Sequence, residues 1–341
     1  MKRRTSSADS ELQRKPKIVI MSIKEMPVNP VADTKLKAVG DVVRLDARDE
    51  QLAEKVSDAD AILIRAGKIS AALIQSAKKL KIIATQGVGV DFIDIDAVEK
   101  SGTVLTTAPI ANVSSVAEHT MCLMLTLARR VCEINEKVKE GKWIQARDEI
   151  EAHPMKLLLG KTLGIVGLGS VGTRVAKRAA AFEMNLVAHD PYIPAERFQE
   201  AGAAPVDLET LLRKSDIVVL HVPLTSLTRH MIGEKQLQMM KRDALLINTA
   251  RGPLIDEQAL YKALKSGIIQ GAALDVREKE PSGADDPLST LQNVILTPHM
   301  AGSSDFTLPR MSETAAEEII RVLRGEKPLH PYVRQALPYP L

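Results

Sequence analysis

The sequence predicts an α/β protein made of two doubly wound parallel sheets. Short apolar runs of strand character alternate with helical patterns, which is typical of parallel sheets that carry helices on both faces. The alternation restarts near Lys161, so two such units are expected. The length of 341 residues also favours two domains. A hydrophobic fraction of 45% and a charged fraction of 26% are those of a globular protein.

The first series of alternating segments spans residues 17–109. Helical patterns such as Ala71–Ala77 and Ile95–Lys100 separate its apolar runs. The expected strands are Lys17–Met21, Val42–Leu45, Ala61–Ile64, Lys81–Thr85 and Val104–Thr106. Near the other end of the chain, Thr307–Arg324 has the apolar spacing of a helix. If this helix packs back onto the first series, the first domain is discontinuous in sequence.

A long apolar helix is expected between the two series. Ser115 and Glu118 have the Ser-x-x-Glu spacing of a capping box, and the helical pattern then runs to about Gly141. Its first half is apolar on most sides, which is typical of a buried helix or an interface, so a hinge and a dimer contact are expected here. Cys122 and Cys132 would lie about 15 Å apart along this helix, too far for a disulfide, and are expected to be reduced core thiols.

The second series opens with a glycine-rich segment between a predicted strand and a predicted helix, Val171–Phe182. Gly167, Gly169 and Gly172 form the pattern Gly-x-Gly-x-x-Gly. The first glycine permits a tight turn, the second lets the backbone approach a pyrophosphate, and the third lets the helix pack close to the strand. The pyrophosphate would lie at the positive end of the new helix. A strand–turn–helix without a nucleotide is the weaker alternative, because the context matches on both sides.

An acidic residue at the end of the next predicted strand indicates which dinucleotide binds. Asp190 lies 18 residues after Gly172, close to the separation at which a carboxylate meets the adenosine ribose. It would accept hydrogen bonds from both ribose hydroxyls and repel a 2′-phosphate, and no arginine is adjacent. We therefore expect NAD rather than NADP. The alternative is that Asp190 only ends the strand.

Three polar side chains follow later strands of the second series, which has six expected strands in all. These are Thr162–Gly167, Asn185–Asp190, Ile217–His221, Ala244–Asn248, Ala272–Val276 and Val294–Thr297. Arg251, Glu280 and His299 come after the last three of them, and open α/β sheets bind ligands at the carboxyl ends of strands. Each residue alone has an ordinary alternative: a salt bridge, a solvated charge, or a histidine that merely ends a strand.

Together the three residue types suit hydride transfer next to a carboxylate. Arg251 could hold a substrate carboxylate with its planar guanidinium. His299 is the natural proton donor because the pKa of histidine lies near neutrality. A partner carboxylate, Glu280, would favour the protonated ring and fix its orientation. The hydride would come from the nicotinamide cofactor.

The motifs resemble, in order and spacing, those of the D-isomer-specific 2-hydroxyacid dehydrogenase family over about residues 17–330. The segments that carry the resemblance are Gly87–Asp91, Asn112–His119, Gly167–Gly172, His221–Thr225, Asn248–Gly252, Leu274–Val276, Glu280–Pro281 and Thr297–His299. The resemblance implies a Rossmann NAD-binding domain (113–302) inserted into a flavodoxin-like substrate domain (17–112 and 303–335). It also implies a homodimer, in agreement with the apolar helix.

The resemblance further implies roles for single residues. Arg251 would bind the substrate carboxylate, and His299 would be the acid and base, with Glu280 as its partner. Cofactor contacts are expected from Gly167, Gly169, Ser170, Val171, Gly172, Asp190, His221, Pro223, Thr249, Ala250, Arg251, Asp275, His299 and Gly302. Backbone amides near Val88 and Gly89 would help bind the carboxylate. Arg277 is a departure, since the family often has an aromatic residue there, and it could alter local packing.

The leading substrate expectation is 3-phosphoglycerate, with Arg65 at the end of a strand meeting its phosphate. The alternative is a surface arginine, and hydroxypyruvate, glyoxylate or another small 2-oxo acid is then the second candidate. Glu280 argues against the formate dehydrogenases of the family, in which a glutamine partners the histidine. NAD-sensing transcriptional corepressors keep similar catalytic residues and form the non-enzymatic alternative. They are disfavoured by the lack of a long extra C-terminal segment in this sequence.

Bulk properties exclude other classes of partner. A net charge of +3 is too small to indicate nucleic acid, and no apolar run is long enough to span a membrane. No cluster of Cys, His or carboxylate residues has metal-ligand spacing. The polar residues 1–16 carry no secretory or transit signal and are expected to be a disordered tail, which predicts a cytoplasmic protein.

Overall fold

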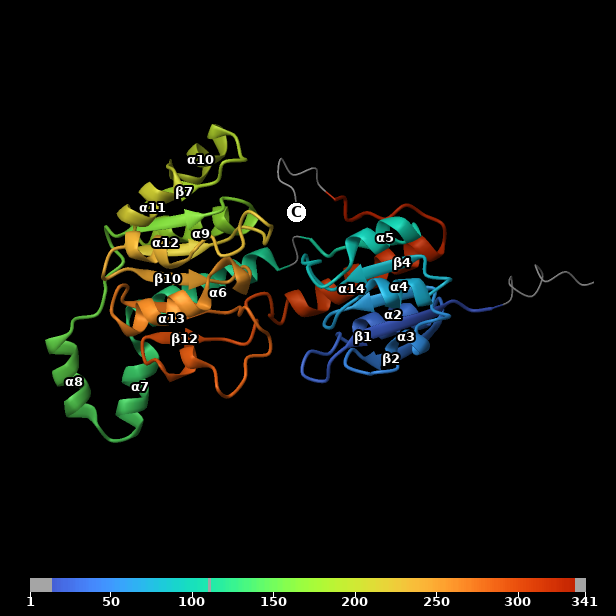
Figure 1. Cartoon of the computed structure of the whole chain (residues 1–341), viewed down its shortest axis with the longest axis horizontal. Coiled ribbons are helices and arrows are strands. Elements are labelled where there is room, and N and C mark those ends of the chain that lie inside the picture. Colours follow the sequence, from blue (N-terminus) through green and yellow to red (C-terminus); the bar gives the residue numbers. More distant parts are fainter. Residues whose placement is uncertain (1–13, 110–111, 335–341) are drawn as a thin grey trace, which may run out of the picture. The chain divides into compact units, whose positions relative to one another are not determined.

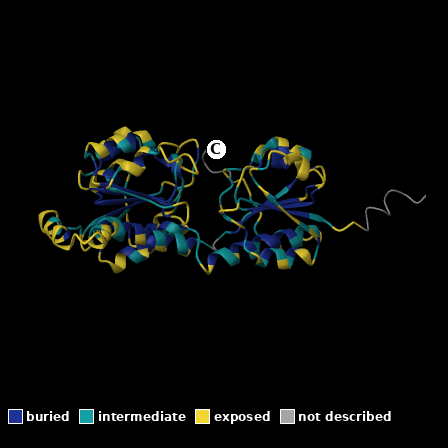
Figure 2. Cartoon of the chain, turned by 90° about the horizontal axis from the view of Figure 1, so that it is seen from below, coloured by how far each residue is buried: buried dark blue, intermediate teal, exposed yellow. Residues whose placement is uncertain are grey.

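The computed structural model describes residues 14–109 and 112–334, which divide into two compact units. Described residues up to 112 and those from 304 onward form the first unit, and residues 113–303 form the second. Each unit is built on one parallel sheet (Figure 1). In both, the central strands are buried, and exposed residues lie mainly on the outer helices and loops (Figure 2). The predicted fold class is confirmed.

The first sheet has the strand order β2-β1-β3-β4-β5, which is the flavodoxin-like order. Its strands are β1 (Lys17–Ser22), β2 (Asp41–Asp46), β3 (Ala61–Ile64), β4 (Ile82–Thr85) and β5 (Val104–Thr106). Its helices are α2 (Val31–Lys37), α3 (Leu52–Lys55), α4 (Ala71–Ser76), α5 (Ile95–Ser101) and α14 (Thr307–Leu323). Side chains of α3, α4 and α5 pack on one face, and those of α2 and α14 pack on the other. All five predicted strands are present.

Helix α14 returns the chain to this first sheet. Its residues Ala315, Ala316 and Ile319 are buried in one cluster with Ile18 and Ile20 of β1. These alanines let the helix lie close to the strands, and Ile319 fills the core without exposure. The first unit is therefore discontinuous in sequence, and the second unit is inserted into it.

The second sheet has seven parallel strands in the order β12-β11-β10-β9-β6-β7-β8. They are β6 (Thr162–Val166), β7 (Asn185–His189), β8 (Ala204–Pro205), β9 (Ile217–Leu220), β10 (Leu245–Asn248), β11 (Gly271–Leu274) and β12 (Val294–Leu296). Strand β8 was not among the six predicted strands. Its two residues are too few to give an alternating pattern, and Pro205 is tolerated because the strand lies at the sheet edge.

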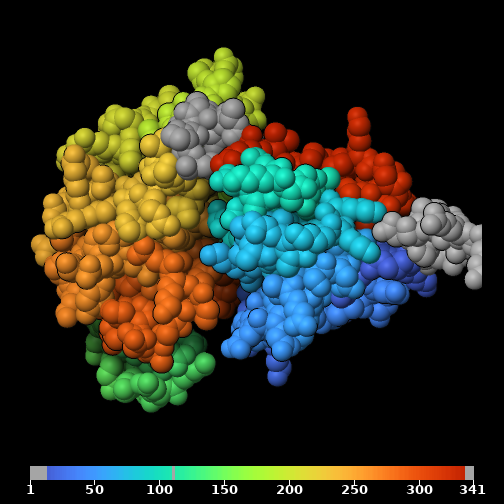
Figure 3. Space-filling view, turned by 45° about the vertical axis from the view of Figure 1, so that its right-hand side comes forward, coloured from blue at the N-terminus to red at the C-terminus, as the bar shows by residue number. Residues whose placement is uncertain are grey.

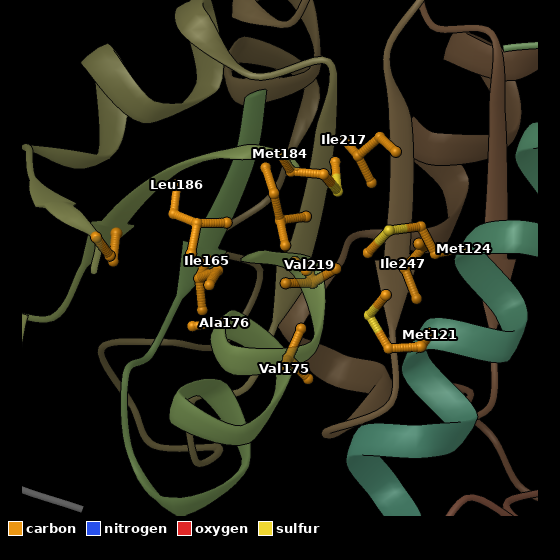
Figure 4. Packing of buried hydrophobic residues seen from close by; sticks show 14 of the residues in the cluster. Met121, Met124, Ile165, Val175, Ala176, Met184, Leu186, Ile217, Val219 and Ile247 are labelled. Carbon is orange, nitrogen blue, oxygen red and sulfur yellow. The ribbon is translucent and has the colours of Figure 1, made fainter. Parts of the chain in front are cut away.

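Helices cover both faces of the second sheet. They are α6 (Val113–Ala128), α9 (Ser170–Ala181), α10 (Ala195–Ala201), α11 (Leu208–Lys214), α12 (Glu234–Met239) and α13 (Glu257–Lys265). Side chains of α6 and α9 pack on one face, and those of α11, α12 and α13 pack on the other. In Figure 4, Met121 and Met124 of α6 point toward the strands that carry Ile247 and Val219. The apolar half of α6 is thus core of the second unit.

The prediction of a single long helix that runs to Gly141 is wrong in two respects. The helix begins at Val113, so Ser115 lies inside its first turn and does not form the predicted capping box. It also ends at Ala128, because Arg130 has the left-handed φ of 50° that breaks helical hydrogen bonding. Helix α7 (Val131–Lys139) follows and has no buried residue. It packs against α8 (Trp143–Ala152), which runs antiparallel to it.

The two cysteines are free thiols but are not in the core, so that part of the prediction is wrong. Cys122 is exposed on α6, between the buried Met121 and Leu123, because successive residues of a helix point in different directions. Cys132 is exposed on α7, which leaves the sheet after the break at Arg130.

Residues 1–13 of the predicted disordered tail lie outside the described residues. The last residues of that segment contact the first unit: Arg14 forms an ion pair with Asp60 at 2.5 Å, and the carbonyl of Pro16 accepts the N–H of Asp41 at 2.8 Å. Within the described ranges, we find no helix that is both long and apolar enough to cross a membrane.

Candidate active site

The glycine-rich loop joins β6 to α9 where the strand order of the second sheet reverses, between β6 and β9. Gly167 has a left-handed φ of 92°, and a Cβ there would lie 2.8 Å from the carbonyl of His221. A Cβ at Gly172 would lie 2.1 Å from the carbonyl oxygen of Gly167. A Cβ at Gly169 would meet no atom within 4 Å. Two glycines are therefore required by close backbone packing, and the middle one faces open space.

This loop fits a dinucleotide. No side chain caps the N-terminus of α9 at Gly169, which leaves the first N–H groups of the helix available to an anion. Ser170 and Val171 lie in that first turn. Across the switch point, His221 has a buried Nε2 without a hydrogen-bond partner among the described residues, and burial lowers its pKa from 6.5 to about 4. The ring is therefore neutral at neutral pH, and its Nε2 is a buried polar atom that still needs a hydrogen-bond partner.

Asp190 follows β7 and lies beside the same loop. Its Oδ2 accepts the N–H of Leu168 at 2.9 Å, and its Oδ1 accepts the N–H of Tyr192 at 3.2 Å. Both contacts fix the carboxylate in position, and each oxygen keeps a further lone pair for a hydroxyl. This arrangement is compatible with the ribose contact that the sequence predicts.

His299 and Glu280 lie in direct contact, in the loops that follow β12 and β11. The Nδ1 of His299 is 2.7 Å from Glu280 Oε2. The hydrogen bond and charge of Glu280 raise the pKa of His299, although burial and the charge of Arg251 act in the opposite direction. Burial acts to raise the pKa of Glu280, but the contact with His299 holds it below its ordinary value. The pair is therefore set up as an ionised carboxylate beside a ring that readily holds a proton.

Asp275 organises the loop that carries His299. Its carboxylate is fully buried and accepts the hydroxyl of Thr297 at 2.5 Å and the N–H groups of Met300 at 2.9 Å and Ala301 at 2.8 Å. Burial acts to raise its pKa, yet His119 and these donors together keep the pKa low. The carbonyl of Asp275 also accepts the N–H of His299 at 2.7 Å. The predicted cofactor contact of Asp275 stays a prediction beside this structural role.

The loop after β10 is held by a buried asparagine. Asn248 Oδ1 accepts the N–H of Ala250 at 3.0 Å, and its Nδ2 donates to the carbonyl of Arg251 at 2.8 Å. The hydroxyl of Thr249 lies 2.9 Å from that of Thr120 on α6. Arg251 Nη1 donates to the carbonyl of Ala250 at 2.7 Å, and the side chain is half-buried. The fold thus brings Arg251, Glu280 and His299 to one edge of the second sheet.

The remaining predicted residues occupy three places. Pro223 follows His221 after β9 and is exposed, and Gly302 follows Ala301 in the loop of His299. Arg65, Val88 and Gly89 belong to the first unit, after β3 and β4, and so share the carboxyl edge of that sheet. The guanidinium of Arg65 donates to the carbonyl of Pro27, and Val88 is 47% exposed.

Sequence reasoning missed two residues of α6 that support the site. His119 Nε2 lies 3.1 Å from the hydroxyl of Thr297 and 3.5 Å from Asp275 Oδ1. Thr120, which is fully buried, contacts Thr249. The available signal was a pair of polar residues directly before the apolar run that starts at Met121. In the part of the chain that the structure describes, no group of His, Cys, Asp or Glu could hold a metal ion.

Comparison with known proteins identifies the family. Residues 121–301 match the model of the NAD binding domain of D-isomer specific 2-hydroxyacid dehydrogenases. The chain belongs to this family. The predicted resemblance is confirmed, and the second unit contains the family's NAD-binding domain.

Relatives of two kinds match most of the chain. The D-3-phosphoglycerate dehydrogenase of Methanocaldococcus jannaschii is 46% identical over 304 residues, which cover 88% of this chain and 57% of that protein. The glyoxylate reductase of Korarchaeum cryptofilum is 45% identical over 280 residues, which cover 81% of this chain and 83% of that protein. The chain thus spans about half the length of the phosphoglycerate dehydrogenases it matches, at 57% and 52% for two of them.

A solved structure has the same fold over nearly the whole chain. The D-lactate dehydrogenase from Aquifex aeolicus complexed with NAD and lactic acid gives a TM-score of 0.81 at 31% identity, covering 91% of this chain and 96% of that one.

The position of Asp190 predicts the choice of dinucleotide. NADH should bind at least tenfold more tightly than NADPH, a difference of about 1.4 kcal/mol, because the carboxylate repels a 2′-phosphate. Asp190→Ser should remove most of this preference. Fluorescence titration with both cofactors measures it, and Asp207→Ser, which keeps a helix cap elsewhere in the same unit, is the matched control. Equal binding of NADPH by the wild type would show that Asp190 does not select the cofactor.

The Glu280–His299 contact predicts a pH-dependent contribution to stability. Because the folded pKa of His299 is raised and that of Glu280 is lowered, the pair should stabilise the protein most between the ordinary values of 4.5 and 6.5. The contribution of His299 should disappear as the pH rises through its folded pKa, and that of Glu280 as the pH falls through its own. Glu280→Gln should therefore lower Tm at pH 5.5 more than at pH 9. A Tm difference independent of pH would contradict an ionised pair.

Proposed function

We propose that this protein is an NAD-dependent dehydrogenase that interconverts a D-2-hydroxy acid and the corresponding 2-oxo acid. The observation that carries the proposal is the Glu280–His299 hydrogen bond of 2.7 Å, at the edge of a sheet whose glycine loop fits a dinucleotide. Arg251, whose charge acts on His299, lies at the same edge. Family membership and the relatives' names support the same reaction class.

The proposal gives each side chain a task that its geometry supports. NAD, when bound, accepts or supplies the hydride. Since Nδ1 of His299 faces the carboxylate of Glu280, it carries a hydrogen, and Nε2 is left to exchange a proton with the substrate oxygen. Glu280 favours the protonated ring, which is the state that reduction of a 2-oxo acid requires. The guanidinium of Arg251 would bind the substrate carboxylate through two parallel hydrogen bonds.

We propose 3-phosphoglycerate and 3-phosphohydroxypyruvate as the substrate pair. Arg65 supports this proposal, because it is a cation at the carboxyl edge of the first sheet, the same edge as Val88 and Gly89. The first relative described above is named for this activity. Glyoxylate or hydroxypyruvate is the second candidate. It is favoured by the relative named glyoxylate reductase and by the contact that already occupies Arg65 at the Pro27 carbonyl.

A substrate panel with NADH tests the proposal. The wild type should reduce at least one of glyoxylate, hydroxypyruvate and 3-phosphohydroxypyruvate, followed as loss of NADH absorbance. His299→Ala should keep NADH binding and lower kcat roughly 10²- to 10⁴-fold, the usual effect of removing a general acid. His230→Ala, which removes the histidine of another His–Glu pair, at 2.5 Å, is the matched control. Binding of NADH without turnover of any 2-oxo acid would contradict the enzyme and favour a binding protein.

The same panel separates the two substrate candidates. If the substrate carries a phosphate, Arg65→Ala should raise KM for 3-phosphohydroxypyruvate at least tenfold and leave glyoxylate reduction almost unchanged. Arg251→Lys should damage turnover of every 2-oxo acid, because it keeps the charge but loses the planar fork. An equal effect of Arg65→Ala on both substrates, or none on either, would contradict the phosphate role.

We also propose that the chain forms a homodimer through α7 and α8, called here the arm, which stands out as a green lobe in Figure 3. Trp143 and Ile144 on α8 are 61% and 66% exposed, and Val131 on α7 is 53% exposed. Arg130 and Lys137 tie the two helices together through Glu149. Large exposed apolar side chains on helices that are held together by ion pairs are typical of an interaction site.

Sedimentation velocity tests the dimer. The wild type should sediment as about twice the chain mass of 37.2 kDa. Trp143→Lys with Ile144→Lys should give monomers, because two charges would be buried in the interface. Leu329→Lys, at a position that is 65% exposed in the first unit, should leave the dimer intact. A monomeric wild type would contradict the proposal.

A further inference from the structure

Two carboxylates enclose the side chain of Arg277. Its Nε and Nη2 donate to the two oxygens of Glu257, both at 2.9 Å. Its Nη1 and Nη2 donate to the two oxygens of Asp286, the second at 3.0 Å. The side chains of Arg277 and Asp286 are only 9% and 7% exposed. We call this group of three residues the arginine clamp.

The two carboxylates belong to separate, locally fixed elements. Glu257 is the first residue of α13, which is capped by Asp256, and Asp286 caps the short helix η2 (Pro287–Thr290). Glu257 also accepts the N–H of Glu278 at 2.7 Å. The clamp therefore fastens both ends of the loop that includes Glu280. A guanidinium can do this because its planar fork forms two bidentate pairs at once.

The backbone of Arg277 contacts both loops of the proposed active site. Its N–H donates to Glu280 Oε1 at 2.8 Å, while Glu280 Oε2 faces His299. On the other side, a Cβ at Gly252 would lie 1.9 Å from the carbonyl of Arg277. Gly252 directly follows Arg251. A displacement of Arg277 would thus move Glu280, whose carboxylate is hydrogen-bonded to the Arg277 N–H.

We propose that Arg277 is a positioning residue, whose clamp on Glu257 and Asp286 holds Glu280 in hydrogen-bonding contact with His299. The proposal rests on the function proposed above. The charged groups with the largest effect on His299 are Glu280, Arg251 and Asp275. The influence of Arg277 is therefore expected to pass through the position of Glu280.

Arg277→Lys tests the clamp because it keeps the charge and loses the fork. We expect kcat to fall roughly 3- to 30-fold, as for a small displacement of a proton donor, while the Kd for NADH stays within twofold. NMR of ring-labelled histidine should show His299 titrating at lower pH than in the wild type, in the direction of Glu280→Gln. The His299 signal is identified by its loss in His299→Ala. Arg213→Lys, at the exposed pair with Glu209, is the matched control and should change neither readout.

A double-mutant comparison separates positioning from a general structural role. In the Glu280→Gln background, Arg277→Lys should cause less than a twofold further loss of kcat, because the group it positions is gone. An equal loss in both backgrounds, or an unchanged His299 titration, would overturn the proposal. If no turnover is found, the His299 titration still tests the positioning role of Arg277. Failure of this proposal is therefore distinguishable from failure of the proposed function. If Arg277→Lys does not fold, Arg277→Gln with Glu257→Gln and Asp286→Asn removes the buried charges together and is measured instead.

Discussion

The parallel register of the second sheet is the constraint on which the rest of the site depends. Every strand ends at the same edge, so residues far apart in sequence are gathered there by backbone pairing alone. The strand order reverses between β6 and β9, and Gly167 and His221 directly follow these two strands. Ligands of open α/β sheets bind at such switch points. The glycine loop, Asp190 and the His299 loop are therefore parts of one edge.

Buried charge at this edge is stabilised by dense hydrogen bonding. Asp275 lies without exposure, yet it is surrounded by a hydroxyl, backbone N–H groups and His119. The arginine clamp follows the same rule, with two carboxylates on one guanidinium. A buried charge without partners would be strongly destabilising. Because each partner comes from a different element, these groups lock loops to one another as well as satisfying their own charges.

Much of the fold and part of the site could be predicted from local patterns. All eleven predicted strands are present, because apolar runs between glycine and polar residues are a short-range signal. The helix break at Arg130 and the exposure of Cys132 could not be predicted, since the apolar pattern continues across the point where α7 leaves the sheet. The edge strand β8 was missed because it makes its pairing in only two residues.

The sequence by itself determined the α/β class, the glycine loop and the positions of Arg251, Glu280 and His299 after three strands, because these strands have a clear apolar pattern. Tertiary structure alone decided which polar groups meet: Glu280 with His299, Thr120 with Thr249, and Arg277 with Glu257 and Asp286. The physical reason is range. Strand and turn preferences act over a few residues. These contacts join segments that are far apart in sequence and come close only when the strands of the sheet pair in register.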